Sequence, residues 1–231
     1  MGMQHVVFVG PQGAGKGTQA AAVAPRFSLT HLSTGDLLRD IMKAESELAG
    51  EVRAIMDRGD LVSDETMARI LFDALDRRAE AGTVCGALFD GFPRNAEQAA
   101  ILERAIVNRG DTLAAVVSID VPRDVLMERL TGRLVCRSCG RTYHRLFNPP
   151  AVDGVCDVDE GELYVRSDDT PDAVNRRLEI YYGQTEPLLA MWRERGLVLD
   201  VDGNDDIAVV SANIVHTLST RLSVATATSQ E

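Results

Sequence analysis

The chain has 231 residues, of which 45% are hydrophobic, and this is enough apolar material for one sizeable core. Its formal net charge of -11 argues against nucleic acid or an anionic membrane as the main partner, because binding to phosphate backbones relies on basic patches. No stretch reaches the roughly 20 apolar residues that cross a bilayer, and the opening residues lack the pattern of a secretion signal. We therefore expect a cytoplasmic protein in a reducing compartment.

Short apolar runs alternate with helical patterns along most of the chain. The β-branched run at residues 5–10 ends in glycine and predicts a buried parallel strand. Further buried strands are predicted at 87–90, 113–120 and 197–201. Helices are predicted from Lys16 to about Pro25, at 64–82 behind Ser63 as N-cap, at 95–110 and at 122–130. Strands that alternate with helices of this length point to an α/β fold with a parallel sheet.

Two segments interrupt the alternation. Residues 34–62 look helical throughout, with no strand, whereas residues 133–169 are polar and rich in turn-forming residues. The second segment has too few apolar residues to hold a core of its own, and long irregular segments of this kind are often lids or binding loops. The end of the sequence, 223–231, is small and polar, and we expect it to be a disordered tail.

A glycine-rich loop, GPQGAGKGT, runs from Gly10 to Thr18 directly after the first predicted strand. It departs by one residue from the strict phosphate-loop pattern, because Gly17 stands between Lys16 and Thr18. The physical logic survives, since closely spaced glycines let backbone N–H groups converge on phosphate oxygens and the following helix adds its N-terminal dipole. The alternative is an ordinary strand-to-helix turn. The apolar strand, the lysine and the following helix favour a phosphate-binding loop.

The end of this loop, GKGTQ, resembles that of the adenylate kinases, one branch of the P-loop nucleoside monophosphate kinases. Further blocks resemble the same family, in the family's order, through nearly the whole chain. These blocks are LSTGDLLR (32–39), GDLVSDE (59–65), DGFPRNAEQA (90–99), ERLTGR (128–133), RTYHRLFNPP (141–150), VRSDD (165–169) and NRRL (175–178).

The resemblance implies a P-loop core with two insertions. The core would comprise residues 1–32, 63–132 and 170–222, with a helical AMP-binding insertion at 33–62 and a small lid at 133–169. The implied reaction is the reversible, Mg²⁺-dependent transfer of a phosphoryl group from ATP to AMP, which gives two ADP. Such a reaction needs in-line positioning, charge neutralisation and exclusion of water more than covalent help, and arginine suits these tasks.

The resemblance also assigns roles to individual residues. The AMP site would comprise Thr34, Arg39, Asp60, Leu61, Val62, Gly91, Arg94, Gln98, Arg166 and Arg177. The ATP site would comprise Gly13, Ala14, Gly15, Lys16, Gly17, Thr18, Arg129, Arg133, Thr142 and Tyr143. The catalytic set would be Lys16, Arg94, Arg133, Arg166, Arg177 and Asp90, with Asp90 orienting magnesium, and with Asp168 and Asp169 orienting the lid arginines.

Other interpretations of single residues stay open at this point. Arg129 and Arg177 could lie on solvated helix faces, as lone arginines usually do. Gln98 could be an exposed helix position, and Asp168 and Asp169 could cap the helix that follows them.

Two other functions compete with an adenylate kinase. A related kinase, such as a UMP/CMP kinase or a GTP:AMP phosphotransferase, would use another acceptor or donor. Thr34 favours AMP, since pyrimidine-preferring relatives usually carry a smaller residue there. A non-catalytic nucleotide-binding regulator would have little need for Lys16 and the full set of arginines. Family resemblance further implies a monomer with ATP, AMP and ADP as its ligands.

Three of the four cysteines lie close together in the predicted lid. Two C-x2-C/D pairs have the spacing of zinc knuckles and predict a metal site with the ligands Cys136, Cys139, Cys156 and Asp159. His144 is the rival fourth ligand, and a disulfide or free thiols are the rival states. Four protein ligands leave no open position, so we expect a structural zinc ion that folds the lid. Cys85 is expected to be a buried small hydrophobe.

Overall fold

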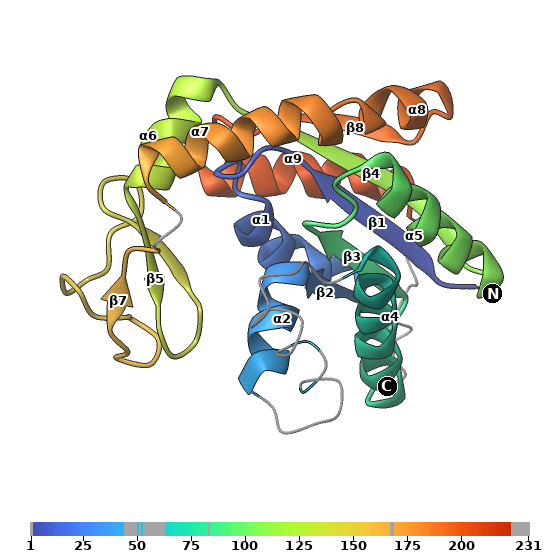
Figure 1. The fold of residues 1–231 in the computed structure, drawn as a ribbon, viewed down its shortest axis with the longest axis horizontal. Coiled ribbons are helices and arrows are strands. Elements are labelled where there is room, and N and C mark those ends of the chain that lie inside the picture. Colours follow the sequence, from blue (N-terminus) through green and yellow to red (C-terminus); the bar gives the residue numbers. More distant parts are fainter. Residues whose placement is uncertain are drawn as a thin grey trace, which may run out of the picture.

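The computed structural model describes residues 2–43, 50, 52, 63–82, 84–166 and 169–222, and for residues 39, 42 and 43 it describes the backbone alone. A sheet of five parallel strands in the order β2-β3-β1-β4-β8 forms its centre (Figure 1). The strands are β1 (Gln4–Val9), β2 (Leu29–Ser33), β3 (Gly86–Asp90), β4 (Thr112–Asp120) and β8 (Val198–Asp202). This order places the loop after β1 between the carboxyl ends of β3 and β4, where α/β sheets bind ligands.

Helices cover both faces of the sheet (Figure 1). They are α1 (Lys16–Val23), α2 (Thr34–Lys43), α4 (Asp64–Glu80), α5 (Ala96–Asn108), α6 (Arg123–Thr131), α7 (Pro171–Ile180), α8 (Leu188–Glu194) and α9 (Ile207–Ser219), with a 3-10 turn η1 (Ala24–Phe27) and a π-helical turn η2 (Tyr181–Thr185). The predicted helices at 16–25, 64–82, 95–110 and 122–130 are confirmed, and Ser63 caps α4 by accepting a hydrogen bond from the Thr66 N–H. None of the described helices combines the length and apolar content that crossing a bilayer requires.

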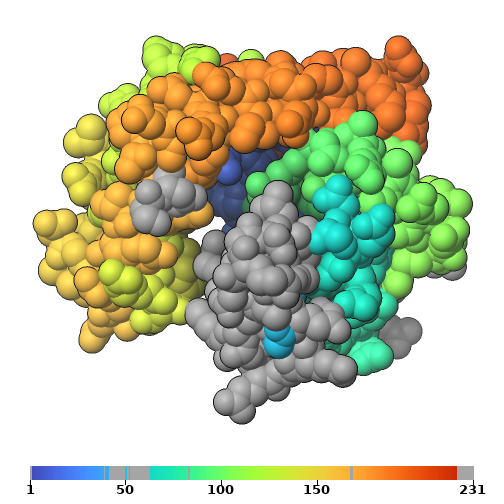
Figure 2. Space-filling view, in the orientation of Figure 1, coloured from blue at the N-terminus to red at the C-terminus, as the bar shows by residue number. Residues whose placement is uncertain are grey.

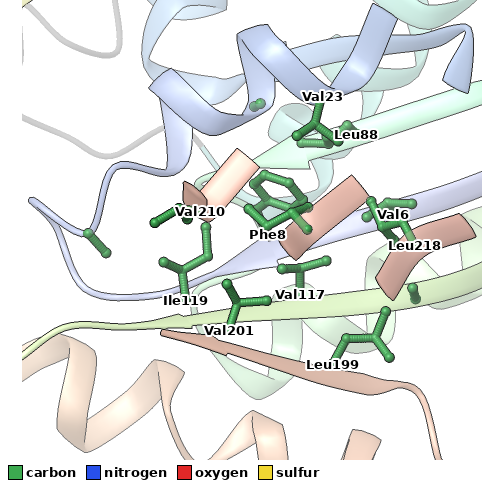
Figure 3. Packing of buried hydrophobic residues seen from close by; sticks show 14 of the residues in the cluster. Val6, Phe8, Val23, Leu88, Val117, Ile119, Leu199, Val201, Val210 and Leu218 are labelled. Carbon is green, nitrogen blue, oxygen red and sulfur yellow. The ribbon is translucent and has the colours of Figure 1, made fainter. Parts of the chain in front are cut away.

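The central strand β1 is buried on both of its faces. Val6 and Phe8 belong to one hydrophobic cluster, shown in Figure 3, to which α1, α7 and α9 contribute. Val7 and Val9 belong to a second cluster on the opposite face, to which α4, α5 and α8 contribute. Since successive side chains of a strand point to opposite faces, burial on both sides requires the continuous apolar run seen in the sequence. The predicted α/β fold with a parallel sheet is confirmed.

The edge strand β2 is the strand of the central sheet that the sequence analysis missed. It pairs only with β3, in register from Leu29 opposite Gly86 to Ser33 opposite Asp90. Its sequence, LTHLS, interrupts the apolar pattern with polar residues, so it lacks the run that marks the other strands. The helix predicted from residue 34 is present as α2, and residues 44–49, 51 and 53–62 of that prediction lie outside the described residues.

The predicted lid contains a small sheet of its own. Its three antiparallel strands have the order β6-β5-β7, with β5 (Arg133–Cys136), β6 (Thr142–His144) and β7 (Leu163–Tyr164). One small buried cluster holds it together, made of Leu134, Cys136, Tyr143, Cys156 and Leu163. The sequence indicated a turn-rich segment without a core, and the structure corrects this: the core exists but is very small, and two of its five members are cysteines.

A buried histidine joins three strands at the end of the sheet opposite the phosphate loop. His5 is 0% exposed, and its Nδ1 accepts a hydrogen bond from the Ala87 N–H at 3.0 Å. Its Nε2 therefore carries the proton and donates to Asp111 at 3.1 Å. Asp111 also accepts a hydrogen bond from the Met3 N–H at 2.7 Å. Burial lowers the pKa of His5, while the hydrogen bond and the charge of Asp111 partly oppose this shift.

This network predicts a pH dependence of stability. Unfolded His5 takes up a proton near its ordinary pKa of 6.5, whereas folded His5 does so only at lower pH, so its contribution is present above pH 6.5 and is lost as the pH falls below that value. We expect the free energy of unfolding from urea titrations between pH 7.5 and 5.5 to fall more steeply in the native sequence than in His5→Gln. The difference between the two slopes of unfolding free energy against pH, native minus His5→Gln, should approach but not exceed about 1.4 kcal/mol per pH unit. His216→Gln, at an exposed position of α9, should keep the native slope, and equal slopes for His5→Gln and the native protein would contradict the assignment.

Candidate active site

The phosphate loop lies between β1 and α1 at the carboxyl edge of the sheet. Gly13 and Gly15 both adopt a φ of 88°, which residues with a side chain rarely do, and Gly15 is the N-cap of α1 without any side-chain cap. The first N–H groups of α1 therefore have no side-chain acceptor, as an anion site requires. Lys16 Nζ donates to the carbonyl oxygens of Gly10 at 2.7 Å and Pro11 at 2.9 Å, so its ammonium lies over the loop.

Several of the predicted catalytic side chains act electrostatically on Lys16. Burial lowers the pKa of Lys16 to about 8; Asp90 opposes this shift, whereas Arg94, Arg133 and Arg177 add to it. These residues come from the start of α1, from the end of β3 and the connection that follows it, from the lid and from α7. On the face shown in Figure 2, the surface is hollowed between the orange α7 and the yellow lid, with blue atoms of the N-terminal segment at the bottom. The fold thus gathers four cations and one carboxylate at one site, as phosphate groups require.

Asp90 ends β3 beside the phosphate loop. Burial alone would raise its pKa, but the hydrogen bond from His31 at 3.4 Å and the charges of Lys16 and Arg94 outweigh burial, and the net pKa is lowered. A Cβ on Gly17 would lie 3.4 Å from the Asp90 carboxylate, so the loop approaches it closely. An ionised carboxylate here suits a magnesium ion and its waters. The sequence analysis did not find His31; a polar residue inside an otherwise strand-like stretch was the available signal.

Three predicted AMP-site residues meet at Gly91, directly after Asp90. The Gly91 carbonyl accepts hydrogen bonds from Thr34 Oγ1 at 3.3 Å and from Arg94 Nε at 2.7 Å. Gly91 has a φ of 83°, and a Cβ on it would lie 2.8 Å from Thr34 Oγ1. The site therefore requires glycine at this position, both for the backbone conformation and for the approach of Thr34.

Gln98 is not an exposed helix residue, which removes that alternative. Its Oε1 accepts a hydrogen bond from the Arg94 N–H at 2.7 Å, and its Nε2 donates to Asp64 at 2.8 Å. It thereby joins the start of α4 to the backbone of Arg94. Of the other predicted AMP-site residues, Arg39 lies on α2 without a described side chain, and Asp60, Leu61 and Val62 lie outside the described residues.

Asp169 joins the two arginines that flank the lid. Its side chain is 0% exposed; it accepts hydrogen bonds from Arg133 Nε at 2.8 Å and Nη2 at 2.5 Å, and from Arg177 Nη1 at 3.3 Å. Thr170 caps α7 by accepting a hydrogen bond from the Ala173 N–H, so capping by Asp169 is wrong. Arg177 is likewise not a solvated lone arginine. Asp168 lies outside the described residues.

Arg166, the remaining predicted catalytic arginine, lies at the end of the lid. Its carbonyl accepts a hydrogen bond from the Asp169 N–H at 3.1 Å, so the backbone of Arg166 lies next to the residue that carries the buried carboxylate.

The residues predicted for the ATP base divide into two groups. Arg129 lies on α6 and donates to the Gly203 carbonyl at 2.9 Å, so it is not a solvated lone arginine. Thr142 is exposed on β6, whereas the neighbouring Tyr143 points into the lid core. The Tyr143 hydroxyl lies 3.4 Å from Cys156 Sγ and accepts a hydrogen bond from the backbone at 2.8 Å. Any nucleotide contact by Tyr143 must therefore come from its backbone.

The predicted metal ligands form one cluster in the lid. Donor atoms of Cys136, Cys139, Cys156 and Asp159 all lie within 4.8 Å of one another. A Cβ on Gly161 would lie 2.7 Å from Cys136 Sγ and 3.0 Å from Asp159 Oδ1, so the backbone there leaves room only for the ligands. The hydrogen bond with Cys156 is the main cause that lowers the pKa of Asp159, to about 2. Three thiols and an ionised carboxylate fit a closed tetrahedral zinc site.

His144 does not belong to this cluster. Its Nδ1 accepts hydrogen bonds from the backbone N–H groups of Leu146 and Phe147, both at 3.0 Å, and its Nε2 donates to the Glu128 carbonyl at 3.2 Å. Both ring nitrogens are therefore engaged in joining the lid to α6. All four cysteines are free thiols, which excludes the disulfide in this structure. Cys85 is half-buried, so the expectation that it is buried is wrong.

The comparisons with known proteins agree with this geometry. The family model described as "Adenylate kinase" matches residues 8–197. The chain is 42% identical over 214 residues to the adenylate kinase of Staphylococcus aureus (strain Mu50 / ATCC 700699), which covers 93% of this chain and 98% of the relative. It is 45% identical over 214 residues to the adenylate kinase of Listeria monocytogenes serotype 4a (strain HCC23), with the same coverage.

The chain belongs to the adenylate kinase family. Both relatives carry the same name, so the comparisons do not favour a UMP/CMP kinase or a GTP-dependent enzyme.

The lid site predicts a metal-dependent stability. Because the lid core has five members and two of them are ligands, we expect chelation of zinc to lower the Tm, measured by differential scanning calorimetry, and zinc to restore it. Cys139→Ser should show the lowered Tm without chelator. Cys85→Ser is the matched control and should respond to chelation as the native protein does. Identical melting curves for zinc-loaded and metal-free native protein would refute a structural metal.

The buried carboxylate of Asp169 predicts a second effect. Asp169→Asn leaves Arg133 and Arg177 facing each other without their counter-charge, so we expect a loss of about 3 kcal/mol in the free energy of unfolding, measured by urea titration. The control Asp200→Asn removes an exposed partner of Arg193 and should cost less than about 1 kcal/mol. If the two variants were equally stable, Asp169 would not be the anchor of these arginines.

Proposed function

We propose that the protein catalyses the reversible transfer of a phosphoryl group from ATP to AMP, giving two ADP, with magnesium bound to ATP. One observation carries this function: Arg94, Arg133 and Arg177 gather with Asp90 around Lys16 of the phosphate loop, in a chain of the adenylate kinase family. A regulator that only binds a nucleotide would have little need for this set of cations.

The acceptor half of the site holds AMP. Arg94, together with Arg39, binds its phosphate, and Thr34 and Gly91 line the base pocket, with Asp60 to Val62 closing over it. The contacts of Thr34 and Arg94 with the Gly91 carbonyl support this grouping. The acceptor phosphate is already ionised, so no general base is needed and the protein acts by positioning.

The donor half of the site holds ATP. The N–H groups of residues 13–18 bind its phosphates, and Lys16 moves from the loop carbonyls to the phosphate oxygens. Arg129, Thr142 and the backbone of Tyr143 lie toward the base. Magnesium supplies charge neutralisation on the ATP phosphates when bound, and Asp90 orients it.

Arginines of the lid and of α7 surround the transferring group. Arg133, Arg166 and Arg177 neutralise its charge, and Asp169 fixes two of them in place. Closure of the lid excludes water, which would otherwise accept the phosphoryl group in place of AMP.

This proposal includes a division of the chain into four parts: a core (1–32, 63–132, 170–222), an AMP-binding insertion (33–62), a lid (133–169) and a disordered tail (223–231). We further propose that the enzyme acts as a cytoplasmic monomer without nucleic acid or membrane partners. The net charge of -11 and the four free thiols support this view.

A coupled assay with a panel of nucleotides tests the function. We expect the highest kcat/KM with ATP as donor and AMP as acceptor. The value should be lower when CMP or UMP replaces AMP, and lower when GTP replaces ATP. Lys16→Met should lower kcat by about 10²–10³-fold, because it removes the loop's charge at the phosphates. Arg193→Met is the control, since Arg193 pairs with Asp200 on the exposed surface. Faster transfer to UMP or CMP than to AMP would refute this acceptor, and transfer to no monophosphate would refute the kinase.

A further inference from the structure

The helix that carries Arg177 does not end at the lid. α7 continues through the π-helical turn η2 toward α8, and the three form one run along the upper side of the molecule in Figure 1. Within η2 the Glu186 N–H donates to the Tyr181 carbonyl at 2.9 Å, which spans five residues where an α-helix spans four. Such turns widen a helix locally and are frequent at functional sites. Here the last residue of the turn is Thr185.

Thr185 makes one hydrogen bond to the active site. It is 8% exposed, and its Oγ1 donates to the Arg94 carbonyl at 2.6 Å. The two residues are 91 positions apart in the sequence. A short bond between a buried hydroxyl and a backbone carbonyl fixes the plane of that peptide, and the Arg94 side chain leaves from the same residue.

The other described hydrogen bonds of Arg94 are local. Its N–H donates to Gln98 Oε1 at 2.7 Å, and its Nε donates to the Gly91 carbonyl at 2.7 Å. Gly91 lies in the β3–α5 connection and Gln98 in the first turn of α5, so both partners are close to Arg94 in the sequence. Among the described hydrogen bonds of Arg94, only the one from Thr185 comes directly from a distant element, whereas Gln98 links Arg94 to α4 indirectly, through Asp64.

We propose that Thr185 is a positioning residue for AMP, which acts by holding Arg94. The inference rests on the proposed function, because it takes Arg94 as the arginine that binds the acceptor phosphate. Arg177, on the same helical run, bonds to Asp169 and so to the lid arginine Arg133. The run α7–η2–α8 therefore holds Arg94, which binds the acceptor phosphate, and Arg177, which lies beside the transferring group. It sets the distance between them, and in-line transfer depends on that distance.

The test compares Thr185→Val, which keeps the shape and removes the donor, with Thr185→Ser, which keeps the hydroxyl. For Thr185→Val we expect kcat/KM for AMP to fall about tenfold and the calorimetric Kd for AMP to rise, with KM for ATP unchanged. Thr185→Ser should recover most of the AMP affinity. The matched control is Thr217→Val, which removes a hydroxyl-to-carbonyl bond of 2.7 Å within α9 and should leave both nucleotides unaffected.

A double-mutant cycle separates positioning from a general structural role. With Arg94→Lys as the second change, Thr185→Val should weaken AMP binding much less than it does in the native sequence. Three results would overturn the proposal: an unchanged AMP affinity in Thr185→Val, an equal loss for ATP and AMP, or full additivity with Arg94→Lys. The proposed function fails separately, when the native protein transfers no phosphoryl group to AMP.

Discussion

Repulsion among four cations is the constraint on which the rest of the site depends. The site contains four cations, Lys16, Arg94, Arg133 and Arg177. The charges of the three arginines each lower the pKa of Lys16. Each is therefore held by an acceptor that is part of the fold. Backbone carbonyls of the loop hold Lys16, the Gly91 carbonyl holds Arg94, and the buried Asp169 holds the other two. The negative charges of bound phosphates would then neutralise cations that the fold already holds in place.

The parallel sheet supplies the rigidity that this arrangement needs. β1 is apolar on both faces and lies in the middle of the sheet, so the loop after it starts from a fixed point. β3 ends beside it, with Phe8 in register with Asp90. The phosphate loop and Asp90 therefore come from neighbouring strand ends, and hydrogen bonds between the strands set their separation.

Much of the fold could be predicted from the sequence, because burial on both faces leaves a mainly apolar run in β1, β3 and β4, and β8 alternates buried apolar with exposed acidic residues. The edge strand β2 escaped because polar positions such as His31 interrupt its apolar pattern, and His31 bonds to Asp90 in the site. The sequence blocks shared with the family predicted which residues belong to the site, but not which contacts these residues make. Neither the inward direction of Tyr143 nor the bond from Thr185 to Arg94 follows from local patterns, since both depend on how distant elements pack.

The lid obeys a different physical rule from the core. A segment that closes over nucleotides must be small, and its five-membered cluster buries too little apolar surface to fold it. The donor atoms of Cys136, Cys139, Cys156 and Asp159 fit a zinc ion, and such an ion would supply that stability without adding size. The lid would then move as one body, joined to the core by the hydrogen bond of His144 to the Glu128 carbonyl on α6 and by the ion pair of Asp169 with Arg177 on α7. Because the second link is an ion pair within the cation cluster, we infer that phosphate binding and lid position are coupled through the same charges.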